Sequence, residues 1–571
     1  MTKYIFVAGG VISGVGKGVT TASIAKLLQA CGFKVTAIKI DPYLNYDAGT
    51  LRPTEHGEVW VTDDGGEIDQ DLGNYERFLG IDLPKKNCLT SGQIYKTVID
   101  RERKGEYLGE TVQFIPHIPE EIKKRIIEAS KGYEIAIIEI GGTIGDFENI
   151  PFLFAAKRLE RDLGKENIIY VLVTYLPIPS HMGEMKTKPT QQAIRMLSES
   201  GIFPDFIVCR SKMHVDAVRK KKIETYANIK SEHVISEPDI DTIYRIPLDL
   251  AAEKLPEKIL AELELEPKKS PDLSQWAELV DRVANSKKAV RVAMVGKYVA
   301  TGDFSLSDSY ISVNESLKHA GAALNCKVQI DWIDAKKLED KANVAKMLKD
   351  FEGIIVPGGF GASGVEGKIN AIQYAREHKV PYLGLCYGMQ LAVIEFARNI
   401  CGLAGANTTE NEKDTPHPVI DMLESQREIL KQSDFGGTMR LGAYVAALRK
   451  GTLIADLYKD RMKEDAPKIA ALEKDPAQKF RIGKTPTDFA VIERHRHRYE
   501  VNPQYIEQIE AKGMLFSGHH VKLDGTKLME FMELSGHPYF TGTQAHPEFK
   551  SGLGRPAPLF YGFVKACCES K

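Results

Sequence analysis

Features that mark several specialised protein classes are missing from this 571-residue sequence. Its eight cysteines are scattered, and neither a CxxC pair nor a Cys/His cluster at zinc spacing is present. The 76 Lys and Arg residues nearly balance the 78 Asp and Glu residues, so the net charge of -2 provides no general attraction to nucleic acid or anionic lipid. We therefore expect a reduced protein without a structural zinc site or a nucleic-acid partner, in which any phosphate site is local.

Long apolar runs are absent too, and the start, MTKYIFVAGG, lacks the basic region, apolar core and cleavage site of a signal peptide. We therefore expect a cytoplasmic protein with no membrane partner. What the sequence does contain is ordinary for globular proteins, with 43% hydrophobic and 27% charged residues. Its length corresponds to roughly two to four domains, each large enough to bury a core.

Two series of short β-branched runs alternate with helical stretches. The first series lies at residues 4–8, 35–40, 135–140, 168–174 and 206–209, and the second at 290–295, 328–333, 353–356 and 382–385. Apolar strands that alternate with helices are typical of parallel sheets covered on both faces. We predict an α/β protein with two doubly wound, mostly parallel-sheet domains at residues 1–265 and 290–571, joined by a polar linker at 266–289. Residues 458–484, rich in Lys, Asp, Glu and Ala, predict a helical surface insertion.

A Gly-rich turn follows the first predicted strand and runs into a helix, in GGVISGVGKGVTTASIAKLL. Gly14, Gly16 and Gly18 would let backbone N–H groups close around phosphate oxygens, and Lys17 would reach the β/γ-phosphates. The turn differs from a strict P-loop, because Gly18 stands where Ser or Thr normally holds magnesium. The pattern predicts a phosphate site, with a flexible Gly turn as the alternative.

Magnesium at this site would depend on other groups. Asp71 lies in the acidic stretch GGEIDQDLGNYERF, and Glu139 ends the apolar run IAIIEI. A carboxylate at the carboxyl end of a parallel strand faces the ligand crevice of an open α/β sheet. Each acid taken alone is also compatible with a solvated surface group.

A candidate nucleophile lies in the second half of the chain. The predicted strand at residues 380–385 runs into Gly-Leu-Cys-Tyr-Gly and then a helix, so Cys386 would project from a tight strand-to-helix turn. His546 and Glu548, in HPE, supply a potential base and its orienting carboxylate. Glycine N–H groups of VPGGFG, at residues 356–361, could form an oxyanion hole. Together these motifs predict acyl transfer through a thioester, whereas the turn alone would also fit a buried structural cysteine.

The motifs together resemble the CTP synthase family over nearly the whole chain. The strings that carry the resemblance are GGVISGVGKG, KIDPYLN, HGEVWVTDDGGE, LGNYERF, VQFIPHIP, EIGGTIGD, GEMKTKPTQ, PGGFG, GGTMRLG, ERHRHRYEVN and HPEF. The resemblance implies a P-loop-like Rossmannoid amidoligase (synthetase) domain followed by a flavodoxin-like class I glutaminase. It further implies conversion of UTP to CTP with ATP and Mg²⁺, through UTP phosphorylated at O4 and ammonia released from glutamine.

The resemblance also implies roles for residues of the N-terminal half. ATP would be bound by Gly14, Val15, Gly16, Lys17, Gly18, Val19, Lys39 and Asp71, and Mg²⁺ by Asp71 and Glu139. UTP, and CTP as a competing feedback inhibitor, would be bound by Ser13, Asp146, Phe147, Glu148, Lys186, Thr187, Lys188, Pro189, Thr190, Gln191 and Lys222. From the residues alone, KTKPTQ would equally fit a polar loop.

In the C-terminal half the implied catalytic residues are Cys386, His546 and Glu548. Glutamine would be bound by Gly359, Tyr387, Gly388, Met389, Gln390, Glu410 and Arg498, with the N–H groups of Gly359 and Tyr387 as the oxyanion hole. Ammonia would pass to the first domain through a tunnel. The run RHRHR, at residues 494–498, alone would also suggest an isolated nucleic-acid patch.

Regulation and assembly follow from the resemblance as well. GTP is expected as an activator, with Arg440 as one contact, and the protein is expected to form homotetramers, with filaments as a further form of assembly. The sequence departs from the family at Ala362 and Ser363, where a bulky residue and Arg are usual, and at Tyr387, where Leu is usual. The first departure predicts altered GTP coupling, and the second adds bulk beside the glutamine site.

Two alternatives remain at this point. A corrinoid amidase would share both halves but would use a carboxylate as the acceptor, and KTKPTQ and HGEVWVTDDGGE argue against it. A nucleotide-binding scaffold related to partitioning ATPases would have no need for Cys386.

Overall fold

The computed structural model describes residues 1–181, 183–297, 300–301, 304–305, 307–422, 426 and 437–570. The chain forms two compact units, of which the first comprises Met1–Ala48 and Ile68–Val280. The second comprises Gly49–Glu67 and Asp281–Lys571. The segment Gly49–Glu67 thus packs with the second unit, although it lies inside the first domain predicted from sequence.

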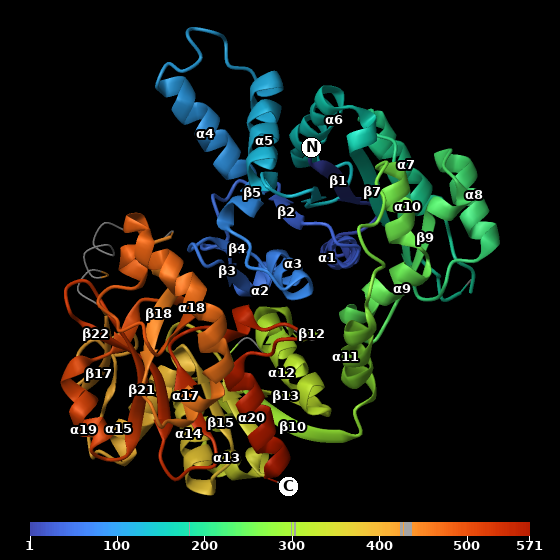
Figure 1. The fold of residues 1–571 in the computed structure, drawn as a ribbon. Helices are drawn as coiled ribbons and strands as arrows, with labels where there is room; N and C mark the ends of the chain where they lie inside the picture. The colour runs from blue at the N-terminus through green and yellow to red at the C-terminus, as the bar shows by residue number, and fades with distance from the viewer. Residues whose placement is uncertain are drawn as a thin grey trace. The chain divides into compact units, whose positions relative to one another are not determined.

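A seven-stranded parallel sheet forms the centre of the first unit (Figure 1). The strand order is β5-β2-β6-β1-β7-β8-β9. The strands are β1 (Lys3–Gly9), β2 (Val35–Asp41), β5 (Cys88–Thr90), β6 (Ile135–Ile140), β7 (Ile168–Tyr175), β8 (Phe206–Ser211) and β9 (Val234–Pro238). The chain moves from β1 toward one edge and later returns toward the other, so the ligand crevice is expected at the carboxyl ends of β1 and β6.

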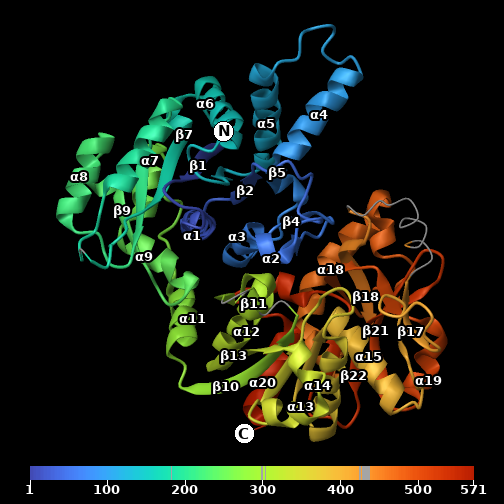
Figure 2. The ribbon, with the colours of Figure 1, turned by 180° about the vertical axis from the view of Figure 1, so that it is seen from behind.

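Helices cover both faces of this sheet, because alternate side chains of each strand point to opposite faces. Ile5 and Val7 pack with α1 (Lys17–Ala30), α3 (Asp71–Leu79), α9 (Ile246–Ala252) and α10 (Leu255–Glu262). Tyr4 and Phe6 pack with α4 (Ser91–Arg103), α5 (Phe114–Ser130), α6 (Ile150–Leu163), α7 (Lys188–Glu199) and α8 (Ala217–Ala227). Figures 1 and 2 show α4 and α5 side by side, projecting from the rest of this unit.

The second unit is built on a nine-stranded sheet of order β13-β10-β14-β15-β23-β22-β21-β18-β19. The first five are parallel: β13 (Cys326–Asp334), β10 (Lys288–Gly296), β14 (Gly353–Val356), β15 (Tyr382–Leu385) and β23 (Phe540–Thr543). The others pair antiparallel: β22 (Lys527–Leu534), β21 (Met514–Val521), β18 (Arg440–Leu448) and β19 (Ala490–His497). The α/β class is confirmed, and the antiparallel half reflects strands such as β21 and β22 that are joined by a short turn.

Helices also cover both faces of the second sheet. One face packs with α12 (Ile311–Leu324), α17 (Leu453–Leu457) and α20 (Pro558–Glu569), and the other with α13 (Lys341–Leu348), α14 (Val365–His378), α15 (Tyr387–Asn399) and α19 (Ile506–Glu510). The remaining elements are α2 (Pro53–His56), β3 (Val59–Val61), β4 (Glu67–Asp69), α11 (Ser274–Asn285), β11 (Ala300–Thr301), β12 (Phe304–Ser305), β16 (Asn407–Thr408), β17 (Pro418–Met422), β20 (Tyr499–Val501) and short 3-10 turns. Helix α11 lies in the predicted linker.

The predicted insertion is helical, but it is more than a solvated decoration. Helix α18 (Lys459–Lys474) buries Arg461, Asp465 and Ile469. The carboxylate of Asp465 accepts a hydrogen bond from the backbone N–H of Ile492 in β19, at 2.9 Å. One side of the insertion is therefore anchored to the edge strand of the sheet.

The segment Gly49–Glu67 is held to the rest of the second unit by ion pairs, each with one buried partner. Asp63 binds the guanidinium of Arg494 at 2.6 Å, and Glu67 binds that of Arg496 at 2.8 Å. The ring of Trp60 lies 4.9 Å from that of Phe549. Both arginines belong to β19, so this segment stabilises that strand. Arg498 follows directly after the end of β19.

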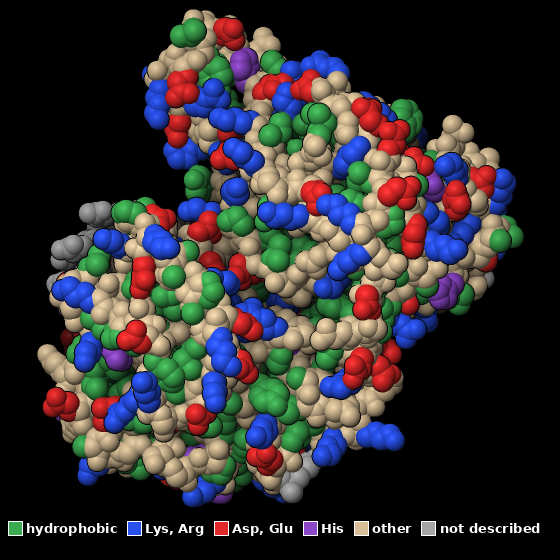
Figure 3. All heavy atoms as spheres, viewed as in Figure 1, with side chains coloured by type: hydrophobic (Ala, Val, Ile, Leu, Met, Phe, Trp, Pro, Cys, Tyr) green, Lys and Arg blue, Asp and Glu red, His purple; other side chains and the backbone are tan. Residues whose placement is uncertain are grey.

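The surface carries charges of both signs. On the face drawn in Figure 3, basic and acidic side chains are intermixed, in keeping with the balanced composition. Within the described ranges, no helix combines the length and apolar character that a bilayer crossing requires.

Candidate active sites

The predicted phosphate loop joins β1 to α1 in the first unit. Gly16 caps α1 with a φ of 96°. Lys17 Nζ donates a hydrogen bond to the carbonyl oxygen of Gly142 at 2.7 Å, and the N–H of Ile144 donates to Gly9 at 2.8 Å. The loop after β6 therefore lies against the phosphate loop, and this is the loop that continues to the predicted residues Asp146, Phe147 and Glu148.

Gly18 has a specific steric role in this site. A Cβ placed on Gly18 would lie 2.4 Å from Oδ1 of Asp71. The Asp71 carboxylate thus occupies the space that a Ser or Thr side chain takes in a strict P-loop. This explains the departure from the P-loop pattern seen in the sequence.

Lys39 lies at the centre of an acidic cluster. Its Nζ contacts carboxylates of Asp71, Glu139 at 3.2 Å and Asp41 at 3.4 Å. The hydroxyl of Tyr75 donates to the other oxygen of Glu139. Burial lowers the pKa of Lys39, but the three carboxylates together raise it well above the ordinary value. Lys39 is therefore a fixed positive charge at the carboxyl ends of the strands.

These carboxylates fit a magnesium ion. One oxygen of Asp71 and one of Glu139 contact Nζ of Lys39, so the two carboxylates lie close together, and oxygen is the ligand that Mg²⁺ prefers. Among the described residues, no group of three or more His, Cys, Asp and Glu side chains could hold a metal by itself. Because Mg²⁺ in nucleotide enzymes is commonly held by one or two carboxylates together with phosphates, the pair is a suitable protein contribution.

The residues predicted to bind UTP are in different environments. Lys186 pairs with Glu184 at 2.8 Å. The buried hydroxyl of Thr190 lies 2.9 Å from that of Thr174, so it is used inside the protein. Lys222 is exposed, and Phe147 is 86% exposed. A common nucleotide site made by these residues stays a prediction.

In the second unit, Cys386 lies at the turn between β15 and α15. Its backbone has a φ of 49°, a conformation that costs energy for a residue with a side chain. A Cβ on Gly388 would lie only 2.0 Å from the carbonyl oxygen of Val356, so glycine is required for this turn to pack against β14. The predicted strand–nucleophile–helix geometry is present.

His546 and Glu548 form the predicted pair. Nδ1 of His546 lies 2.7 Å from Oε1 of Glu548, and among the described residues its buried Nε2 has no hydrogen-bond partner. Burial lowers the pKa of His546, but the negative charges of Glu548 and Cys386 outweigh this effect and raise it to about 10. A protonated imidazole beside the sulfur favours the thiolate, the reactive form of cysteine.

Cys386 borders two cavities of the second unit. Cavity A, of about 220 Å³, is lined by Gly359, Phe360, Cys386, Tyr387, Gln390, Glu410, His497, Arg498 and Tyr499. Cavity B, of about 230 Å³, is lined by Cys386, His546 and Arg496 together with Leu51, Pro53 and Val59 of the segment Gly49–Glu67, among others. Cys386 therefore borders cavity A, which contains predicted glutamine contacts, and cavity B, which has a different lining.

Not every predicted glutamine contact lines cavity A. Gly388 and Met389 are buried and lie outside its lining, whereas Glu410 and Arg498 contribute to it. The guanidinium of Arg498 donates to Gln426 and Thr438 at 2.8 Å each. Burial raises the pKa of Glu410, while its hydrogen bond from the N–H of Gly361 opposes the rise. Cavity A thus offers a cation and a carboxyl group, the pair that a zwitterionic amino acid requires.

Two lysines that no motif indicated lie beside the glycine loop. Lys297 Nζ donates to the carbonyl oxygen of Phe360 at 2.7 Å. Lys368 is fully buried, its Nζ lies 5.6 Å from the ring centre of Tyr387, and it has no hydrogen-bond partner among the described residues. Burial, and to a smaller extent Lys297, lowers the pKa of Lys368 to about 7. A single lysine within a helix carries no sequence signal that could have revealed this position.

Replacing Lys368 with methionine should stabilise the second unit. Folding lowers the pKa of this amine from 10.5 to about 7, so the buried ammonium destabilises the folded state in full below pH 7, and the cost disappears as pH rises to 10.5. We expect Lys368→Met to raise the free energy of unfolding at pH 7 by about 4 kcal/mol. Calorimetry at pH 7 and pH 10 measures this gain, which should shrink at the higher pH.

The matched control for this prediction is Lys346→Met, because Lys346 is exposed on α13. That variant should unfold at the wild-type temperature. A lower unfolding temperature for Lys368→Met at pH 7 would contradict the destabilising role of the buried ammonium.

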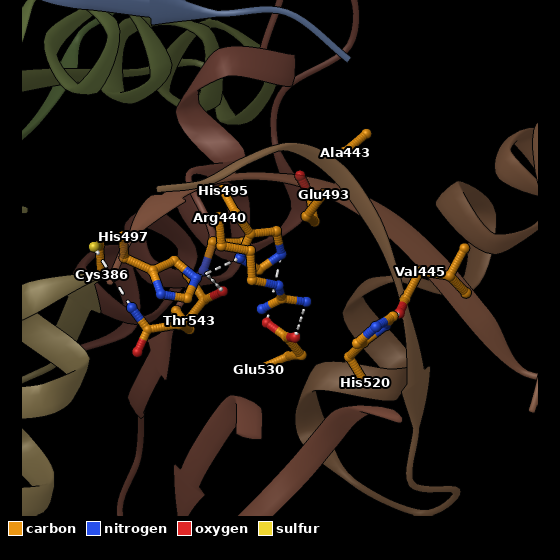
Figure 4. A network of polar contacts seen from close by, with 12 residues as sticks. Cys386, Arg440, Ala443, Val445, Glu493, His495, His497, His520, Glu530 and Thr543 are labelled. Carbon is orange, nitrogen blue, oxygen red and sulfur yellow. Dashed lines mark hydrogen bonds and ion pairs between the residues drawn. The ribbon is translucent and has the colours of Figure 1, made fainter. Parts of the chain in front are cut away.

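Arg440 belongs to a buried polar network behind Cys386 (Figure 4). Its guanidinium pairs with Glu530 at 2.7 Å and Glu500 at 3.5 Å. His495 and His497 contact each other at 3.1 Å, and burial followed by the charge of Arg440 lowers the pKa of both well below the ordinary value. The side chain of Arg440 is therefore buried and paired with two carboxylates, and its contact with GTP stays a prediction.

Comparisons with known proteins found matches in both halves of the chain. A family model described as CTP synthase N-terminus matches residues 3–265, and a model described as glutamine amidotransferase class-I matches residues 305–566. CTP synthases of Pyrococcus furiosus and Methanocaldococcus jannaschii are each 49% identical to this sequence, over 571 and 575 aligned residues, covering 100% of this chain and 99% of the relative. A solved structure described as the glutaminase domain of Trypanosoma brucei CTPS with bound acivicin is 32% identical, covers 49% of this chain and 94% of that chain, and has a TM-score of 0.40.

Proposed function

The chain belongs to the CTP synthase family, and from that premise we propose how its two units divide the conversion of UTP, ATP and glutamine into CTP. As a member it is a glutamine-hydrolysing ligase, with ATP as the co-substrate. The observation that carries the proposed division is the position of Cys386 on both cavity A and cavity B. A nucleophile in that position can take its substrate from one cavity and release a small product into the other.

Cavity A is the proposed glutamine site. Sγ of Cys386 forms a bond to the side-chain carbonyl carbon of glutamine, and the carbonyl electron pair moves to oxygen, where the N–H groups of Gly359 and Tyr387 stabilise it. The C–N bond then breaks, and His546 gives its proton to the leaving ammonia. Water hydrolyses the thioester with His546 as the base, and Glu548 keeps the imidazole oriented.

Cavity B is the proposed exit for ammonia. It lies beside both Cys386 and His546, and five of its lining residues come from the segment Gly49–Glu67, so an N-terminal part of the chain helps to form it. Ammonia that passes through this cavity without meeting bulk water would stay unprotonated and nucleophilic. Passage toward UTP through this cavity would explain why the segment packs with the second unit.

The first unit is the proposed site of UTP activation. The loop from Gly14 to Val19 would bind ATP, and Lys17 and Lys39 would stabilise the charge on the transferred phosphoryl group. The γ-phosphoryl group passes to O4 of UTP and ADP leaves; ammonia then forms a bond to C4 as phosphate departs. Asp71 and Glu139 would hold Mg²⁺, which neutralises phosphate charge when bound.

UTP is proposed to bind at Ser13, residues 146–148, residues 186–191 and Lys222, with CTP competing there as a feedback inhibitor. GTP activation belongs to the same proposal, although Ala362 and Ser363 predict that it is weaker here.

A homotetramer is proposed as the working assembly. The exposed side chains of Phe114 and Ile115 on α5 and of Ile150 and Phe154 on α6 are suited to contacts between subunits.

The test is CTP formation from UTP, ATP and Mg²⁺ with glutamine, with ammonium chloride, and with glutamine plus GTP. We expect CTP from both nitrogen sources and little increase with GTP. CTP from ammonium alone would contradict the proposed glutaminase, and a large increase with GTP would contradict the effect assigned to Ala362 and Ser363. Formation of no CTP from either source would overturn the proposed function.

A further inference from the structure

A glutamine side chain lies directly against the nucleophilic sulfur. Gln544 is fully buried and precedes His546 by two residues. Its Nε2 lies 3.6 Å from Sγ of Cys386, within the distance of a hydrogen bond to sulfur. Its backbone N–H donates to the carbonyl oxygen of Glu530 at 2.8 Å, which fixes the main chain at this position.

A second glutamine determines which end of the Gln544 amide faces the sulfur. Nε2 of Gln390 lies 2.9 Å from the carbonyl oxygen of Tyr499 and 3.1 Å from Oε1 of Gln544. Because a carbonyl oxygen only accepts hydrogen bonds, Gln390 must place its NH₂ group here. The NH₂ group then meets the oxygen of Gln544, so the NH₂ group of Gln544 is directed to Cys386.

This orientation has a defined electrostatic effect. A thiolate accepts hydrogen bonds but cannot donate them, so an N–H group on the sulfur stabilises the charged form. A different polar neighbour of Sγ, the carbonyl oxygen of Arg496 at 3.9 Å, can only accept from the neutral thiol. Gln544 therefore favours the thiolate, and Arg496 opposes it.

We propose that Gln544 is a further catalytic residue, which stabilises the Cys386 thiolate through its amide N–H, and that Gln390 is a positioning residue that orients this amide. The inference rests on the proposed glutaminase function and extends it. The same N–H would act twice. It donates to the thiolate before the S–C bond forms, and it donates again to the negative charge that returns to Sγ when water breaks that bond in the thioester.

Alkylation of Cys386 tests the proposal without any CTP assay. In the full-length protein, the rate of iodoacetamide modification of the Cys386 peptide is followed by mass spectrometry between pH 5 and pH 10. For Gln544→Leu we expect the pH midpoint of this rate to rise by about one unit, with roughly tenfold slower modification below the midpoint. Gln544→Glu keeps the shape but replaces the donor with an acceptor, so its midpoint should rise at least as far.

A double-mutant comparison tests the role of Gln390. Gln390→Leu should raise the midpoint in the wild-type background but should add little when Gln544 is already leucine. Its effect on the KM for glutamine should persist in both backgrounds, because Gln390 lines cavity A. Equal midpoint shifts in the two backgrounds would show that Gln390 does not act through Gln544.

Ser517→Ala provides the matched control. Ser517 is a buried residue of β21 whose hydroxyl has no hydrogen-bond partner among the described residues, and its loss should leave the midpoint unchanged. An unchanged pH midpoint of modification in Gln544→Leu and Gln544→Glu would overturn the proposal. If the leucine variant does not fold, an unchanged midpoint in Gln544→Glu alone would overturn it. Absence of CTP formation by the wild-type protein would instead overturn the proposed function. The two failures can be told apart, because the alkylation rate is measured without CTP formation.

Discussion

Replacing Cys386 with alanine should abolish CTP formation from glutamine while leaving formation from ammonium within about twofold of the wild-type rate. The variant lacks the atom that forms the thioester, and loss of a nucleophile commonly lowers a rate by 10⁴-fold or more. The substitution is confined to the second unit, so the phosphate loop and the Lys39 cluster keep their geometry. Steady-state CTP formation with each nitrogen source measures both effects.

Cys401→Ala is the matched control, because Cys401 is another free cysteine of the second unit that lies outside the lining of both cavities. It should form CTP from both nitrogen sources at wild-type rates. Loss of the ammonium-dependent rate in Cys386→Ala would contradict the division of chemistry between the units. Retention of the glutamine-dependent rate would exclude Cys386 as the nucleophile.

The second large effect is expected at Gly18. A serine there would place Cβ 2.4 Å from the position of Asp71 Oδ1, so the carboxylate must move away from Lys39. We expect Gly18→Ser to lower CTP formation from glutamine and from ammonium alike, by at least about 100-fold, because misplaced charge-stabilising groups cost that much in phosphoryl transfer. Hydrolysis of glutamine to glutamate should continue, and it is measured separately.

Gly132→Ser tests whether a serine for glycine change in the same unit is harmful by itself. A Cβ at Gly132 meets no atom within 4 Å, although its φ is 87°. The control should therefore lose some stability but keep its CTP-forming activity. Wild-type activity in Gly18→Ser would contradict the role assigned to the space beside Asp71.

Much of the fold could be predicted from the sequence, because its cause is local. Apolar runs such as residues 135–140 form buried parallel strands, and the Gly-rich turn and the turn at Cys386 follow their strands as predicted. The pairing of His546 with Glu548 could be predicted for the same reason, since the two residues are separated by a single proline. Interactions between residues that are close in the sequence can therefore be predicted from it.

What the sequence did not predict depends on contacts between distant residues. Arg440 lies in a recognisable motif, but its partners Glu500 and Glu530 are 60 and 90 positions away, so its burial could not be inferred. Gln544 has no signal beyond its proximity to HPE, and its orientation is set by Gln390, 154 positions earlier. The anchoring of α18 to β19 likewise depends on tertiary packing, because the composition of that helix is that of a solvated one.

The segment Gly49–Glu67 limits how this protein can be dissected. A fragment that begins near residue 290 would contain the proposed catalytic residues, but it would leave Arg494 and Arg496 without Asp63 and Glu67. Removing the carboxylate partner of a buried arginine such as Arg494 is costly, and the wall of cavity B would be incomplete. The boundary between the two family matches is therefore not a boundary between independent modules. Any evolutionary exchange of the glutaminase for another would have required a matching change in the segment Gly49–Glu67, which is encoded more than 200 codons upstream of the glutaminase match.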